Sequence, residues 1–211
     1  MRPIDFNRNN SAKLSPDELE LVKELVYESL EKAGQSMAQM LRIRIKPELL
    51  DFGNGFAGAL TEFDQLGRFK VHVVKVRFQG EITGAFYFII NDHEVDLINR
   101  VCLPAEFTSG RRMENKQMKH GFMMEIENLI AALSLKEISE FLGVQSIGGV
   151  PDVQVLKGDQ INDYLYRENM HYNTAFFVQS TLASRAVEIA PYFIWMLDEK
   201  FIEKLRLNIV S

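Results

Sequence analysis

The chain has 211 residues, of which 46% are hydrophobic, and its formal net charge is −5 with a pI near 5.5. The hydrophobic content is enough for a sizeable core and excludes global disorder, and the acidic balance argues against a nucleic-acid partner. The longest unbroken apolar run, from Ala85 to Ile90, is far shorter than the roughly 20 residues of a membrane helix, so we expect no membrane span.

Few residues suit a disulfide or a metal site. Cys102 is the only cysteine, which excludes an internal disulfide and fits a reducing compartment. The four histidines lack the pair spacings of metal sites, so we predict no metal held by the protein. Residues 1–14 are polar and asparagine-rich without the apolar region of a signal peptide, and we expect a polar N-terminal arm on a cytoplasmic protein.

A long helix is predicted at the start of the folded region. Ser15 is a typical N-cap residue, Pro16 suits the first helical position, and Glu18 completes a capping box. The helix should therefore run from Pro16 to about residue 41.

The next residues predict a strand and a glycine loop. Residues 42–46 alternate charged and apolar side chains, which predicts a half-exposed strand ended by Pro47. Residues 53–58 match G-x-G-x-x-G, a spacing that can bind a pyrophosphate at a helix start. Only a weak apolar run precedes this motif and no acidic ribose ligand follows at the expected distance. We therefore expect a flexible glycine loop, with a small-molecule sensor as an alternative.

A hairpin and a short helix complete the first half of the chain. Residues 69–78 and 82–90 are rich in β-branched and aromatic side chains and are separated by a short Gln-Gly-Glu turn. Asp92 is expected to cap a helix that ends near residue 101. The segment 103–113 breaks the periodicity and is predicted to link two halves.

The segment from Lys116 to Leu142 is predicted to form one long amphipathic helix. At about 100° per residue, one apolar stripe should face the core, formed by Met118, Phe122, Ile126, Leu129, Ile130 and Leu133. A second stripe lies on a different side and contains Gly121, Glu125, Asn128 and Ala132. There, two small residues bracket a carboxylate and a carboxamide, so another surface can approach the helix and meet both polar groups. The alternative is an ordinary solvated helix face.

The rest of the chain repeats the earlier order of elements. Residues 144–150 predict a short strand ended by Pro151, and residues 174–181 and 189–197 predict paired strands. Asp198 is expected to cap a last helix that ends near residue 207.

The repeated order predicts an internal duplication. Pro47 and Pro151 lie 104 residues apart, and Asp92 and Asp198 lie 106 residues apart. The two halves therefore keep nearly the same register along their length.

The predicted fold class is α+β. One domain should span residues 15–211 and consist of two repeats, at about 15–102 and 113–208. Two long helices should pack on an antiparallel sheet and be related by a pseudo-two-fold axis.

Glu125, Asn128 and Pro151 have a specific spacing, with two residues between the first pair and twenty-two between the last. In this spacing the sequence resembles the CheC, CheX and FliY family of chemotaxis phosphatases, which remove phosphate from the aspartyl phosphate of the response regulator CheY. The family pattern begins with Asp or Ser four residues before the Glu. Residues 78–98 are also similar to the family's central hairpin and helix. The resemblance implies a CheC-like fold, with Pro151 as part of the structural motif.

Three positions near the pair depart from the family's pattern. Gly121 stands where the family has Asp or Ser, Ala132 where many members have Gly, and Glu127 where a small residue is usual. All three are expected to contact the partner. Glu127, about 100° round the helix from Asn128, should flank the stripe and add negative charge near the phosphoryl group.

The resemblance implies a phosphatase that acts on a CheY-like receiver domain. Asn128 would orient the attacking water and Glu125 would pair with a lysine of the receiver, while the receiver holds the Mg²⁺ and this chain holds no cofactor. The positions 104 residues earlier hold Leu21 and Glu24, so at most one active site is predicted. The alternative is a catalytically silent CheC-like adaptor that binds a receiver, a CheD-like protein or a flagellar switch component. Both hypotheses are compatible with a monomer or a homodimer.

Overall fold

The computed structural model describes residues 14–41, 46–54, 63, 66–105, 113–170, 172, 174–183 and 188–210. The helices are α1 (Pro16–Leu41), α3 (Asp92–Cys102), α5 (Met113–Leu142), α6 (Gly158–Asn169) and α7 (Glu199–Val210). The strands are β1 (Lys46–Asn54), β2 (Lys70–Gly80), β3 (Gly84–Asn91), β4 (Ser146–Gly148), β5 (Asp152–Lys157), β6 (Thr174–Ala183), β7 (Glu188–Ile189) and β8 (Tyr192–Leu197).

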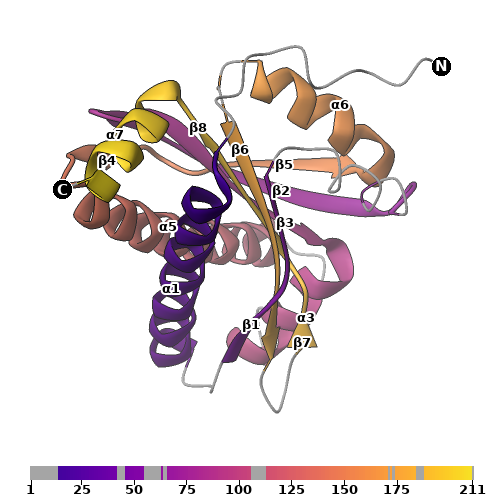
Figure 1. Cartoon of the computed structure of the whole chain (residues 1–211). Coiled ribbons are helices and arrows are strands. Elements are labelled where there is room, and N and C mark those ends of the chain that lie inside the picture. The colour runs from indigo at the N-terminus through magenta and orange to yellow at the C-terminus, as the bar shows by residue number, and fades with distance from the viewer. Residues whose placement is uncertain are drawn as a thin grey trace.

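The strands form one sheet with α1 and α5 on one face and α6 on the other (Figure 1). The strand order is β1-β6-β8-β3-β2-β4, with β5 also beside β2 and β7 beside β6. All these pairings are antiparallel. The prediction of an α+β fold with long helices on an antiparallel sheet is confirmed. No helix in the described part of the chain is long and apolar enough to cross a membrane.

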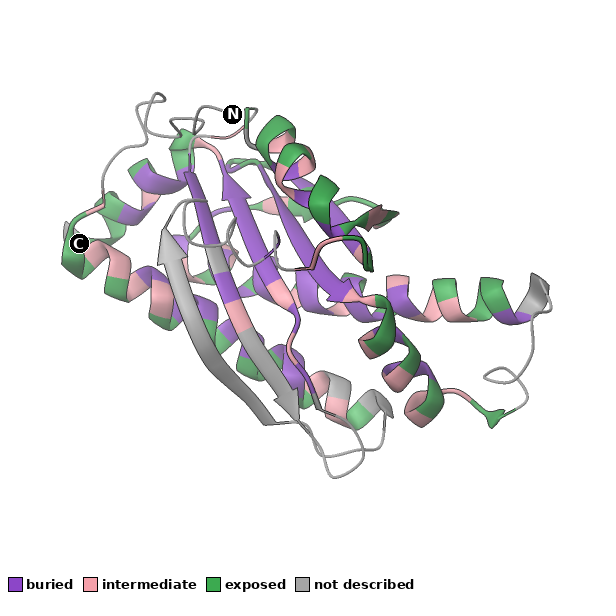
Figure 2. Cartoon of the chain, turned by 90° about the vertical axis from the view of Figure 1, so that its right-hand side faces the viewer, coloured by how far each residue is buried: buried purple, intermediate pink, exposed green. Residues whose placement is uncertain are grey.

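Alternation of side chains along β2 divides the core in two. Val74, Val76 and Phe78 belong to the larger cluster with α1 and α5, whereas Val71 and Val73 belong to a smaller cluster with α6. Strand β3 is buried along nearly its whole length because both of its faces are covered, as Figure 2 shows for the middle strands. The middle of the sheet is thus a rigid support for both layers of helices.

Two helix starts show how local sequence directs the fold. The Ser15 hydroxyl accepts a hydrogen bond from the Glu18 N–H at 3.2 Å, and the Ser15 N–H donates to the Glu18 carboxylate at 2.6 Å, so the predicted capping box of α1 is confirmed. At α3 the cap is one residue earlier than predicted. Asn91 caps the helix through a capping box with Glu94, and Asp92 is the first helical residue.

Pro47 does not end a strand, as predicted, but lies near the start of β1, where it pairs with Leu182. A proline is tolerated there because β1, among the described strands, lies at the edge of the sheet and pairs only with β6. Residues 42–45 and residues 55–58 of the predicted glycine loop lie outside the described residues, as do residues 1–13 and 106–112.

The chain after α5 differs from its prediction in two ways. Strand β4 has three residues, and Pro151 lies between β4 and a second strand, β5, instead of ending the segment. Helix α6, which follows β5 directly, was not predicted from the sequence. The predicted pairing of the last two long strands, β6 and β8, is confirmed.

Candidate functional site

Helix α5 contacts α1 on one side and strands β2 and β4 on another, so a wide part of its surface is buried. Its buried apolar side chains are Met123, Ile126, Ile130, Ala131, Leu135, Ile138 and Leu142. Of the predicted core stripe, Ile126 and Ile130 are buried, Met118 is 43% exposed, and Phe122, Leu129 and Leu133 are half-buried. The buried side of α5 is therefore turned by roughly 130° from the predicted core stripe, and the predicted core face is wrong apart from Ile126 and Ile130.

The second predicted stripe lies on the side of α5 that faces away from this core. Glu125, Asn128 and Ala132 are exposed, and Gly121 is half-buried. A Cβ at Gly121 would meet no atom within 4 Å, so the position has room for a side chain and is not a packing requirement. The carboxylate and the carboxamide are thus presented on one accessible helix face.

Glu127 is about 100° round α5 from Asn128 and lies on the buried side of the helix. The residue is 1% exposed, and its Oε2 has no hydrogen-bond partner among the described residues. Burial raises the pKa of the Glu127 carboxyl well above its usual range. The prediction that Glu127 flanks the exposed stripe and adds negative charge there is wrong, because the residue lies at the centre of the buried face.

Ion pairs fix α5 to its neighbours on both sides. Lys32 of α1 forms an ion pair with the buried carboxylate of Glu137, and this hydrogen bond raises the pKa of the Lys32 ammonium. Near the other end, Lys119 lies 3.7 Å from Asp96 of α3. The exposed pair, Glu125 and Asn128, therefore projects from a helix held by packing and by charge.

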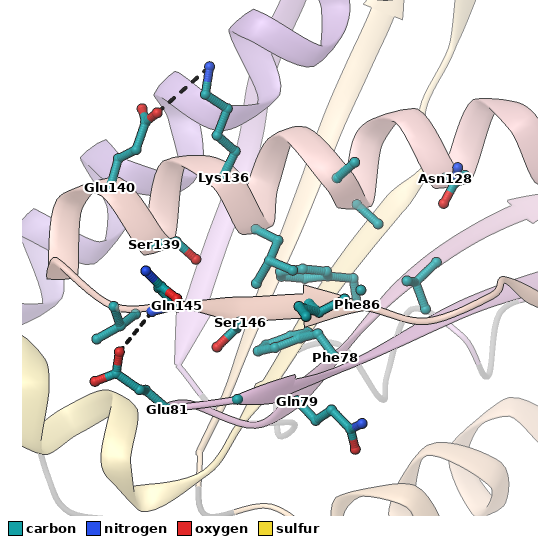
Figure 3. Close-up of a pocket in the computed structure, with 18 residues that line it drawn as sticks. Phe78, Gln79, Glu81, Phe86, Asn128, Lys136, Ser139, Glu140, Gln145 and Ser146 are labelled. Carbon is teal, nitrogen blue, oxygen red and sulfur yellow. Dashed lines mark hydrogen bonds and ion pairs between the residues drawn. The ribbon is translucent and has the colours of Figure 1, made fainter.

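Asn128 also lines a groove of about 900 Å³ between α5 and the nearby end of the sheet (Figure 3). Its apolar lining consists of Val76, Phe78, Phe86, Ala131, Ala132, Leu135, Val144 and Ile147. Figure 3 shows Asn128 towards one end of the groove, with Lys136 and Glu140 towards the other. These two charges pair with each other at 3.7 Å. The groove is thus a mainly apolar hollow that begins beside the exposed amide.

A β-bulge shapes the open side of this groove. Gly148 pairs with Phe78 and Asp152 pairs with Lys75, so the three residues 149–151 lie opposite two residues of β2. Across the bulge, the Gly149 N–H donates to the Arg77 carbonyl at 2.7 Å. Ile147 of β4 and Val150 of the bulge are 77% and 83% exposed. Pro151, part of the sequence motif, lies in this bulge.

A polar cluster on the other face of the sheet was missed by the sequence analysis. Lys75 of β2 is 5% exposed, and its ammonium lies 3.2 Å from both carboxylate oxygens of Glu168 in α6. The Tyr87 hydroxyl donates to the same carboxylate at 2.9 Å, and burial raises the pKa of Tyr87. The sequence signal that could have revealed this cluster is Lys75, a lysine within a strand that is otherwise mainly apolar. The contacts tie α6 to the sheet.

In the part of the chain that the structure describes, no three His, Cys, Asp or Glu side chains are grouped to hold a metal ion. The site around Asn128 therefore offers one amide, one carboxylate and an apolar hollow. An amide both donates and accepts hydrogen bonds, so it can orient a polar molecule such as water. The carboxylate of Glu125 can pair with a cation on a partner.

No family model matches the sequence, and no curated protein sequence matches it. Solved structures do match. FliY from Thermotoga maritima is 14% identical to this chain and superposes with a TM-score of 0.71, over 93% of this chain and 98% of its own. The chain has the CheC-like fold.

Two further solved structures have this CheC-like fold. A chain of the FliG–FliM complex from H. pylori is 9% identical, with a TM-score of 0.61 over 90% of this chain and 100% of its own. A chain of the CheX–CheY–BeF3–Mg²⁺ complex from Borrelia burgdorferi is 15% identical, with a TM-score of 0.50 over 83% of this chain and 98% of its own. At these identities the likeness establishes the fold of the chain.

Proposed function

We propose that this protein is a phosphatase for the aspartyl phosphate of a CheY-like receiver domain. The observation that supports it most directly is the placement of Glu125 and Asn128, which are both exposed on the face of α5 that the core does not use. A likeness to a CheX chain crystallised with CheY, BeF3 and Mg²⁺ is consistent with a receiver as partner.

The proposed chemistry is hydrolysis by one positioned water. The Asn128 amide enters the receiver's active site, accepts a hydrogen bond from a water and holds its oxygen in line with the phosphorus. The water oxygen bonds to phosphorus, the bond from phosphorus to the aspartyl oxygen breaks, and inorganic phosphate and a free aspartate result. Glu125 pairs with a lysine of the receiver and fixes the docked orientation. The Mg²⁺ of this reaction belongs to the receiver.

An internal duplication is part of this proposal, with one site in its second half. The strand order supports it, because exchanging the first-half and second-half strands in β1-β6-β8-β3-β2-β4 gives the same order read from the opposite edge. At the positions 104 residues before Glu125 and Asn128, α1 has Leu21 and Glu24. Leu21 is half-buried and Glu24 is exposed, so α1 offers no equivalent pair.

A second candidate function is a silent adaptor that binds a receiver or a flagellar switch component. The observation that favours it is the higher TM-score with the chain of a FliG–FliM complex than with the chain of the CheX–CheY complex. An adaptor would bind the phosphorylated receiver and leave the phosphate in place.

The decay of a phosphorylated receiver with its Mg²⁺ tests the proposal. We expect wild type to accelerate the decay, and Asn128→Ala and Glu125→Ala to remove most of the acceleration. Gln35→Ala is the matched control, because it removes an exposed amide from α1. If every receiver of the source organism decays at its spontaneous rate with wild type present, the phosphatase proposal fails, and binding without acceleration selects the adaptor.

A further inference from the structure

The exposed side of α5 carries a line of apolar side chains beside the two polar residues of the proposed site. Met118 is 43% exposed, and Phe122, Leu129 and Leu133 are half-buried at the margin of the larger core cluster. These residues occur at i, i+4, i+11 and i+15, so they follow one side of the helix and form what we call the outer stripe. The described part of the chain leaves the outer stripe partly open to solvent.

Helix α1 shows a different kind of exposed side. It is mainly charged, as expected of a solvated surface helix, with glutamates one turn after another at Glu20, Glu24, Glu28 and Glu31. On α5, apolar side chains occur nearly all round the helix, a pattern typical of a helix that is covered on more than one side. The composition of α5 therefore fits a helix that packs against a further surface.

The position of the outer stripe decides what can cover it. Met118 lies ten residues before Asn128, about 15 Å along the helix axis, and Leu133 lies five residues after it, about 8 Å. Met118 is also only about 20° round the helix from Glu125, so the two residues lie on the same side of α5. A standard protein interface covers about 800 Å² on each partner, which is a disc about 16 Å in radius. A receiver whose phosphoryl group meets Asn128 therefore reaches the outer stripe as well.

A second copy of this chain suits the outer stripe less well. Leu129 follows Asn128 directly in the sequence, and Met118 lies on the same side of the helix as Glu125. A copy seated on the outer stripe would therefore cover both polar residues of the site. The proposed reaction requires these residues to meet the receiver. The molecule that covers the outer stripe and the substrate are thus the same.

We propose that the outer stripe of α5 is a docking surface for apolar side chains on the receiver next to its phosphorylation site, and that Met118 is a specificity residue for the receiver. The inference rests on the proposed receiver partner and deepens it. Asn128 supplies the chemistry, whereas the outer stripe supplies affinity and selects the receiver by apolar contact and shape. Methionine suits this role because its unbranched, flexible side chain adapts to an irregular surface.

The test separates binding from catalysis with Met118→Asp, Met118→Ala and Met118→Leu. Met118 belongs to neither core cluster, so these changes should leave the core intact. We expect Met118→Asp to raise the Kd for a BeF3-activated receiver and the KM for the phosphorylated receiver by about tenfold or more, with kcat unchanged. Met118→Ala should raise both by about threefold, and Met118→Leu should stay close to wild type because it keeps the apolar contact.

Met170→Asp is the matched control. Met170 is a 65% exposed methionine at the end of α6, which lies on the other face of the sheet from α5 (Figure 1). The same substitution there should leave the Kd and the KM at their wild-type values.

Two results would overturn the inference. One is a Kd for Met118→Ala equal to that of wild type, because any effect of Met118→Asp would then come from its charge and not from a lost apolar contact. The other is a wild-type dimer in sedimentation that Met118→Asp dissociates, which would place a second copy on the outer stripe. Both are distinct from failure of the phosphatase proposal, in which wild type binds the receiver and leaves its decay unchanged while Met118→Ala still weakens binding.

Discussion

Helices α1 and α5 cover the same face of the sheet, yet their exposed sides offer different chemistry. α5 presents Glu125 and Asn128, with Ala132 one turn further along, whereas α1 has Leu21 and Glu24 at the positions 104 residues before the pair. Both helices are anchored in one core and joined by an ion pair. Under the proposed function, the exposed amide of Asn128, and not the rigidity of the helix, is what distinguishes α5 from α1.

The buried sides of the two helices differ as well. Where its side chains are described, the buried face of α1 is apolar apart from Ser29, whose hydroxyl donates to the Val26 carbonyl at 2.8 Å. The face of α5 contains two carboxyl groups, Glu127 without a partner at Oε2 and Glu137 paired with Lys32. An unpaired buried carboxyl costs stability, so Glu127 is an unfavourable group on the buried face of α5.

The largest expected effect comes from exchanging the residues at two matching positions, Asn128 of α5 and Glu24 of α1. Asn128→Glu should reduce the acceleration of receiver dephosphorylation by about 100-fold or more, because it replaces the positioning amide by an anion next to the phosphoryl group. Glu24→Asn on α1 should leave the rate unchanged. Initial rates of phosphate release measure both. Activity gained by Glu24→Asn, or retained by Asn128→Glu, would show that the two helices do not differ as described.

The next effect concerns the buried side of α5 and its dependence on pH. The unfolded chain releases the Glu127 proton near pH 4.3, whereas burial raises the pKa in the folded chain. Above the unfolded pKa and up to the raised one, the unfolded state therefore binds fewer protons, and stability falls as pH rises, by about 1.4 kcal/mol per pH unit for one proton. Glu127→Gln cannot lose this proton and should be more stable than wild type at pH 8.

Urea unfolding of wild type and Glu127→Gln at pH 5 and at pH 8 measures this difference. Glu24→Gln, an exposed carboxyl on α1, is the control and should follow wild type at both pH values. If the free energy of unfolding changes equally between pH 5 and pH 8 in wild type and in Glu127→Gln, Glu127 is not held protonated by burial.

The smallest expected effect concerns the contact between the two helices. Lys32→Ala removes the partner of the buried Glu137 carboxylate and should lower the Tm by about 2–4 °C. Lys23→Ala removes the exposed pair with Glu20 on α1, at 3.2 Å, and should change the Tm by less. Equal shifts in thermal unfolding would show that the contact between α1 and α5 is no stronger than a surface pair.

Local sequence signals predicted the elements that local chemistry controls. The capping box at Ser15 and the hairpin of β2 and β3 follow from neighbouring residues. These features depend little on what packs against them.

Features that depend on distant neighbours were not predictable in the same way. Helical period gives the angle of Glu127 relative to Asn128, but apolar residues occur nearly all round α5, so the period does not say which side two neighbours will cover. Pro47 was predicted to end a strand. It is instead tolerated within an edge strand, and the place of a strand at the edge of a sheet is a tertiary property that the local sequence does not contain. The groove and bulge combine α5 with two strands from opposite halves, and no short segment contains them.

The most direct test of the account compares the rate of dephosphorylation by Asn128→Ala with its affinity for the receiver. We predict that Asn128→Ala binds a BeF3-activated receiver with a Kd within about twofold of wild type, while dephosphorylation at saturation falls by about 100-fold or more towards the spontaneous rate. Dephosphorylation by Asn128→Ala at the wild-type rate would contradict the claim that the exposed amide of α5 positions the water.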